Sequence, residues 1–233
     1  MATIVEGQNS FLLPQLIGKP TRLTLKGAVG VGIGVGLVSS AVTLGAMNLG
    51  YYSYNTLTAL FLLTIVLHIL TPLIVASLTV VLIARYVHSE QYQLLCLTPL
   101  SDHKFVEGYF RAALYQSRLL LAILAGSTPM LVLPFFPSGV FYLWFLIPFL
   151  VSAWGFVRLA VALSLNWTLR SNQLWRPLLF APLILVIGGA FFLAIMLLMD
   201  IVSLGFIPYA YMVLPSLIAS SIRDDARRWV RLQ

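Results

Sequence analysis

The side chains of this chain that could do chemistry are few, and most of them flank long apolar runs. The 233 residues include seven acids and three histidines. No acid lies in the middle of an apolar run, where a carboxylate could relay protons, so proton-driven transport is not expected. The acids are Glu6, Glu90, Asp102, Glu107, Asp200, Asp224 and Asp225.

His68 is the one titratable side chain near the middle of an apolar run, in the stretch LLTIVLHILTPLIV. A histidine in that position needs a partner. One interpretation is a neutral imidazole that bonds a neighbouring helix or the carbonyl oxygen freed by Pro72. The other is an axial ligand of haem or of a chlorophyll-type pigment. His88 and His103 lack cysteine or acidic partners at regular spacing, so no metal site is predicted.

Catalysis by this chain alone is not expected. The only Gly-Lys pair, Gly18-Lys19, precedes Pro20 and lacks the upstream glycine and the Ser or Thr of a phosphate-binding loop. Any ATP hydrolysis would therefore occur on a partner subunit. The lone Cys96 excludes an internal disulfide.

Long apolar helices must position these residues, because 60% of the chain is hydrophobic and only 9% is charged. That composition is typical of an integral membrane protein. The apolar runs are continuous and do not alternate with period two, so we predict an all-α polytopic membrane protein and no β-barrel. Six transmembrane helices are predicted at about 27–49, 56–84, 112–136, 139–165, 178–199 and 201–220.

The 14 Lys and Arg residues predict the orientation. They flank both ends of the chain and the connections between spans two and three and between spans four and five. The connections around 50–55, 137–138 and 200 contain none. The positive-inside rule thus places both termini in the cytoplasm, in a bacterial-type inner membrane. The net charge of +7 fits attraction to anionic membrane lipids, and no nucleic acid is expected.

The predicted organisation has three parts. Residues 1–26 form a cytoplasmic interfacial segment, 27–220 the six-helix transmembrane domain, and 221–233 a cytoplasmic basic tail.

Two features inside the predicted spans bear on packing and binding. Gly32 and Gly36 have the small-xxx-small spacing of close helix packing. Arg158, in the cytoplasmic half of span four, is expected to extend its side chain to the inner interface, and the alternative is that it binds an anionic substrate.

The polar segment 86–108 lies between spans two and three. Pro99 disfavours helix at Thr98, and Ser101 or Asp102 can cap a new helix, so two short helices around a break are predicted. The second helix runs without another proline into span three. The first piece is too apolar to be freely solvated and too charged to insert, so it is expected to lie at the membrane surface. There it either anchors the loop or binds a partner.

The run LLCLTPLS at 94–101, followed by Phe105, Val106 and Gly108, resembles the cytoplasmic segment after the second span in permease subunits of ABC-2 type transporters. In that family the segment is a coupling helix that docks on the nucleotide-binding subunit. The resemblance implies an ATPase-coupling role for Glu90, Gln93, Leu94, Leu95, Leu97, Thr98, Pro99, Leu100, Ser101, Phe105, Val106 and Gly108.

By this resemblance, the chain is expected to be a permease subunit that pairs with a second copy or a paralogue. A separate ATPase would drive it, and it would move a lipid, a glycan or a hydrophobic small molecule. The chain departs from the family's pattern at Glu90-Gln91, Gln93 and Tyr109, and it leaves little room between spans five and six for short outer helices. These departures favour the alternative, a non-transporting accessory subunit of a larger energy-converting or photosynthetic membrane complex, in contact with a pigment, a carotenoid or a quinone near His68.

Overall fold

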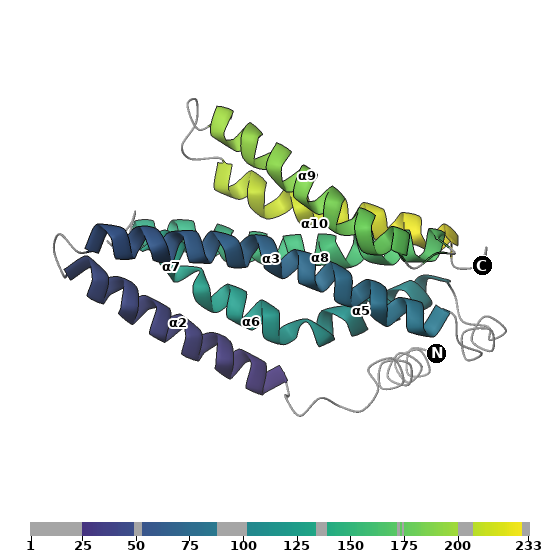
Figure 1. Ribbon diagram of the computed structural model, residues 1–233, viewed down its shortest axis with the longest axis horizontal. Coiled ribbons are helices and arrows are strands. Elements are labelled where there is room, and N and C mark those ends of the chain that lie inside the picture. Colours follow the sequence, from purple (N-terminus) through teal and green to yellow (C-terminus); the bar gives the residue numbers. More distant parts are fainter. Residues whose placement is uncertain are drawn as a thin grey trace.

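The computed structural model describes residues 25–48, 53–87, 102–133, 139–171, 173, 175–199 and 207–229. Every regular element in these ranges is helical (Figure 1). The elements are α2 (Leu25–Asn48), α3 (Ser53–Val87), α5 (Asp102–Gln116), α6 (Arg118–Ser127), α7 (Pro129–Val132), α8 (Gly139–Arg170), α9 (Trp175–Met199), α10 (Ile207–Ala226) and the 3-10 helix η2 (Arg227–Trp229).

The all-helical prediction is confirmed for the described part. Three stretches are long and apolar enough to cross a membrane, namely Leu25–Asn48 in α2, Thr58–Arg85 in α3 and Phe149–Arg170 in α8. They make the chain compatible with a membrane protein. Six membrane crossings remain a prediction.

The sixth span was expected at about 201–220, and the described helix α10 runs from Ile207 to Ala226. It therefore includes 221–226, the first residues of the predicted basic tail. Arg223 and Asp225 in this part bond to residues of neighbouring helices. The cytoplasmic tail itself stays a prediction. The residues between α9 and α10 lie outside the described ranges.

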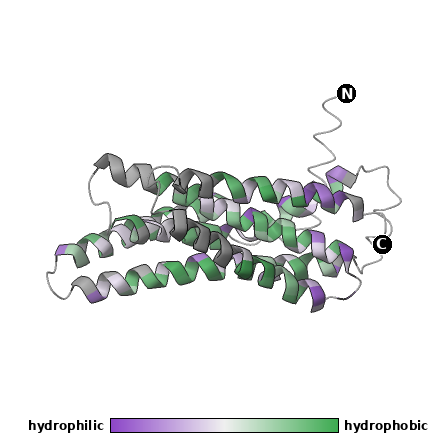
Figure 2. Ribbon diagram, turned by 90° about the horizontal axis from the view of Figure 1, so that it is seen from above, coloured by the Kyte–Doolittle hydropathy of each residue, from purple (hydrophilic) through white to green (hydrophobic). Residues whose placement is uncertain are grey.

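Consecutive long helices run in opposite directions, so the ends of α3, α8 and α10 and the starts of α5 and α9 meet at one end of the molecule (Figure 1). We call this the charged end. Every acidic residue of the described ranges belongs to α5 or to the last turns of α10. Figure 2 shows hydrophilic residues gathered there and mainly hydrophobic residues along the rest of the helices. The described acids are thus kept away from the part of the bundle that suits hydrocarbon.

Helix α8 is central and α2 is peripheral. In the most apolar window of α8, 61% of the residues are buried, against 17% in α2. Helix α8 packs against α3, α9 and α10, and α5 also reaches it. The main hydrophobic cluster includes Val75 and Ile83 of α3, Val106 of α5, and Val157 and Val161 of α8.

Helices α2 and α6 approach until their backbones touch. A Cβ placed on Gly32 would lie 3.1 Å from the carbonyl oxygen of Ala122, and one placed on Gly126 would lie 2.6 Å from the carbonyl oxygen of Gly32. Gly36 faces Gly126 one turn further along. The Ser39 hydroxyl donates a hydrogen bond to the Gly126 carbonyl oxygen over 2.8 Å. The two glycines singled out for close packing therefore lie against α6, where a larger side chain would separate the helices.

The helix that starts at Asp102 passes into α6 through a bend at Ser117. The Ser117 backbone has φ −81° and ψ −1°, away from ordinary helical values. Its hydroxyl donates to the carbonyl oxygen of Ala113 over 2.8 Å, a contact that often bends helices. The bend separates α5, which packs on α8, from α6, whose main neighbour is α2.

The backbone contact between α2 and α6 predicts that one added methyl group at the contact destabilises the fold. Gly126→Ala should lower the free energy of unfolding by about 1–3 kcal/mol, because the new methyl must displace Gly32 or Val35. Gly34→Ala is the matched control, since nothing lies within 4 Å of a Cβ at Gly34, and alanine is the better helix former. Thermal unfolding of the purified chain in detergent measures both. Equal unfolding temperatures for the two variants would contradict the close approach.

Candidate functional site

Helix α5 is amphipathic, and its apolar face is fixed in the core at the charged end. Phe105, Val106, Tyr109 and Phe110 recur at helical spacing, and all four are buried. The rings of Phe105 and Tyr109 lie 4.7 Å apart between centroids. The helix packs against α3, α8 and α10. Any movement of its first turn must therefore displace the neighbouring helices as well.

The predicted coupling residues fall in two groups. Phe105 and Val106 lie on the buried face of α5, and Gly108 is half-buried beside them. The structure thus places these three in the first turns of α5, where the polar segment ends. The others lie outside the described ranges: Glu90, Gln93, Leu94, Leu95, Leu97, Thr98, Pro99, Leu100 and Ser101.

Glu107 ties α5 to α10. One carboxylate oxygen, Oε2, accepts a hydrogen bond from Nη1 of Arg223 over 2.9 Å, across 116 residues of sequence. The other, Oε1, accepts from Nε of Arg111 over 2.9 Å. The Glu107 and Arg223 side chains are only 21% and 20% exposed, whereas Arg111 is 59% exposed. The bond to Arg223 is therefore less screened by solvent and the stronger of the two.

Phe110 is shared by two guanidinium groups. The Cζ atom of Arg223 lies 5.5 Å from the ring centroid and that of Arg158 lies 5.9 Å from it. Both distances are within the range of cation–π attraction. We call Glu107, Phe110, Arg158 and Arg223 the Phe110 cluster. Arg158 belongs to none of the ion pairs that join described residues.

A second set of contacts fixes the end of α10 to the end of α8. The Asp225 carboxylate accepts a hydrogen bond from Nδ2 of Asn166 over 3.1 Å and pairs with Arg170. The Arg170 guanidinium also lies 4.8 Å from the ring of Trp229 in η2. Helix α10 and η2 are thus held on α8 up to the last described residue.

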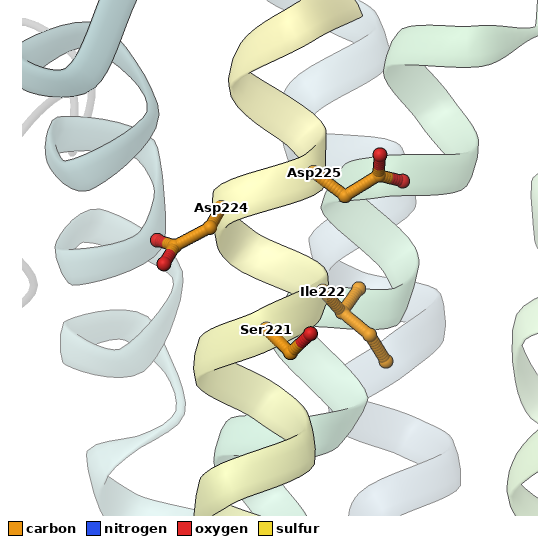
Figure 3. A pocket seen from close by; sticks show the side chains of 4 residues that line it. All are labelled: Ser221, Ile222, Asp224 and Asp225. Atoms are coloured by element: carbon orange, nitrogen blue, oxygen red, sulfur yellow. The ribbon is translucent and has the colours of Figure 1, made fainter.

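An open hollow of about 480 Å³ lies on α10 beside these contacts and is lined by Ser221, Ile222, Asp224 and Asp225. Figure 3 shows the two carboxylates pointing to opposite sides of α10. Asp224 pairs with Arg227 over 2.8 Å, and Asp225 pairs with Arg170. Because the acids diverge and are already neutralised, the hollow does not form a cation site.

His68 takes a third partner that neither sequence interpretation named. Its Nδ1 lies 2.8 Å from the carbonyl oxygen of Thr64, one turn earlier in α3. Nδ1 therefore carries the proton, and Nε2 keeps its lone pair. Nε2 is buried and, within the described part, has no hydrogen-bond partner. This tautomer leaves one nitrogen available as an acceptor or ligand.

The sequence reasoning did not identify Glu107 and Arg223 as partners. Arg118, within the predicted third span, is 7% exposed and donates a hydrogen bond to the carbonyl oxygen of Tyr115. Among the described residues, no group of three His, Cys, Asp or Glu side chains could hold a metal ion.

No family model, curated protein or solved structure matches this chain. At the charged end, ion pairs join α5 to α10 and α8 to α10. The guanidinium groups there can also attract anions.

The Glu107–Arg223 contact predicts an energetic coupling between α5 and α10. In a double-mutant cycle, Glu107→Gln and Arg223→Gln should show an interaction energy of about 1–2 kcal/mol, since the pair is partly shielded from solvent. Arg111→Gln, which removes the exposed partner, should change the free energy of unfolding by less than about 0.5 kcal/mol. Chemical or thermal unfolding in detergent measures the stability of the four proteins of the cycle and of Arg111→Gln. An additive cycle would mean that the pair does not couple the helices.

Proposed function

We propose that this chain is the membrane permease subunit of an ABC-2-like exporter. It crosses the inner membrane six times, with the charged end and both termini in the cytoplasm. It binds no ATP itself, and a separate ATPase docks on the segment 86–108. Together with a second permease copy or a paralogue, it moves a lipid, a glycan or a hydrophobic small molecule outward.

One observation carries this proposal: α5, whose first two turns are the last residues of the coupling-like segment 86–108, is packed on α8 and bonded to α10. Four buried side chains fix its apolar face, and Glu107 bonds Arg223 of α10. A force applied before Asp102 would therefore reach the central helix of the bundle. This is the connection that a coupling segment requires.

The charge distribution supports the proposed orientation. Three stretches have the length and apolarity of membrane spans. The described acids and most of the described Lys and Arg residues lie toward the charged end (Figure 2). A basic end is favoured at the cytoplasmic face, next to anionic lipids.

The bend at Ser117 suggests how the force is converted into movement. Helices α5, α8 and α10 are joined at the charged end, while α6 is joined to α2 by touching backbones. A tilt of α5 pivots at Ser117 and shifts the α2–α6 pair relative to α8 and α10. In a dimer of permeases, such a shift alternately opens a path to each side of the membrane.

Two variants separate ATPase binding from coupling. The full chain, purified from its source membrane with the ATPase that accompanies it, is reconstituted in vesicles with a fluorescent phospholipid as the transport probe. Leu97→Asp should abolish association with the ATPase, because a charge enters the proposed docking face. Glu107→Gln should keep the ATPase bound but lower the amount transported per ATP hydrolysed at least about fivefold.

Arg111→Gln is the control, because it changes the exposed partner of the same carboxylate. It should leave both association and transport per ATP unchanged. The proposal fails if no protein with a complete phosphate-binding loop accompanies the chain, or if Glu107→Gln transports as the unchanged chain does.

The buried Nε2 of His68 favours a second candidate function, an accessory subunit that holds a pigment or a haem in a larger membrane complex. A histidine whose Nδ1 is bonded to a carbonyl oxygen presents Nε2 in the protonation state of a metal ligand. In this case the purified chain absorbs visible light, and His68→Leu removes that absorbance. His103→Leu, on the exposed side of α5, leaves it intact. A colourless preparation excludes this candidate.

A further inference from the structure

Arg158 is a charge inside a stretch that suits a membrane span, and it has no carboxylate partner among the described residues. It lies about three turns, or about 18 Å, before the Arg170 end of α8. The stretch Phe149–Arg170 is one of the three apolar candidates for a span. A guanidinium in such surroundings requires an anion or water. The Phe110 ring satisfies only part of that requirement.

The surroundings of Arg158 carry an excess of positive charge. Arg158 and Arg223 share the Phe110 ring. Glu107 is divided between Arg111 and Arg223, and Asp224 has Arg227 as its nearest partner. The described carboxylates nearest in the ion-pair network are thus already paired with other arginines, so an anion from outside would neutralise Arg158.

The helix face below Arg158 is apolar and accessible. Trp154 lies one turn deeper on the same face of α8 and is 42% exposed, although it belongs to the central helix. Beside Trp154 along α8, Gly155 brings α10 close, because a Cβ there would lie 3.1 Å from the Ser216 hydroxyl. This arrangement fits a phospholipid, because Arg158 would face the phosphate group and Trp154, one turn deeper, would face the acyl chain.

We propose that the Phe110 cluster binds the phosphate group of an anionic phospholipid from the leaflet at the charged end. Arg158 supplies the main charge-assisted hydrogen bonds, Arg223 adds a second positive charge, and Phe110 holds the two guanidinium groups side by side. Trp154 contacts the acyl chain. The shared chemistry is a phosphate, so a soluble phosphate ester is the other possible source of the ligand. The site does not depend on ATPase coupling.

The test measures lipid binding to the isolated full chain by native mass spectrometry in detergent. The probes are phosphatidylglycerol, diacylglycerol with the same acyl chains, and glycerol phosphate. Phosphatidylglycerol should occupy one site in preference to diacylglycerol. Arg158→Gln should weaken that site about tenfold, since it removes charge-assisted hydrogen bonds. Arg158→Lys should retain part of the affinity, because the charge remains.

Arg176→Gln is the matched control, because Arg176 lies in the first turn of α9 and contacts Trp175. It should leave binding unchanged. Arg158→Gln should unfold at nearly the same temperature as the unchanged chain in neutral detergent, which separates loss of binding from loss of fold. Displacement of phosphatidylglycerol by glycerol phosphate would assign the site to a soluble phosphate ester. Equal binding of diacylglycerol, or unchanged binding by Arg158→Gln, would overturn the proposal.

Because the binding assay contains no ATPase, its outcome is independent of the proposed transport function. An exporter without this lipid would still show the effect of Glu107→Gln on transport per ATP. A lipid-binding accessory subunit would show the Arg158 effect alone.

Discussion

The cost of leaving a charge unpaired in apolar surroundings constrains the described part of this molecule. It confines the described acids to α5 and the end of α10, and it makes those two segments partners. Glu107 and Arg223 meet only because both must lie at the charged end. The same constraint leaves the remaining length of the helices free to be apolar, so packing there depends on shape. Gly155 and Gly126 let α10 and α2 approach their neighbours closely.

Two kinds of contact therefore stabilise different parts of the bundle. At the charged end, ion pairs and cation–π contacts specify which helices meet, as Asp225 does with Asn166 and Arg170. Further along, small residues and interhelical hydrogen bonds such as Ser39 to Gly126 fix the distance between helices. In a membrane, where apolar surfaces gain little from leaving lipid, this combination is needed for a defined structure. Ser117 lies at the junction between the two regions.

The helical class could be predicted from the sequence, because uninterrupted apolar runs have few other structures available. The pairing of Glu107 with Arg223 could not be predicted from the sequence, because the two residues are 116 positions apart and follow no local spacing. The tautomer of His68 depends on the carbonyl oxygen of Thr64. The sequence interpretation had instead considered a carbonyl oxygen freed by Pro72.

The contact between Gly32 and Gly126 has a consequence for biosynthesis. Helix α2 is made early, but the surface that covers its glycines is not synthesised until the chain has grown beyond residue 126. Until then this face of α2 has no partner helix to cover it. Folding thus cannot be completed strictly in the order of synthesis, and α2 reaches its final place only after a helix encoded far downstream has been made.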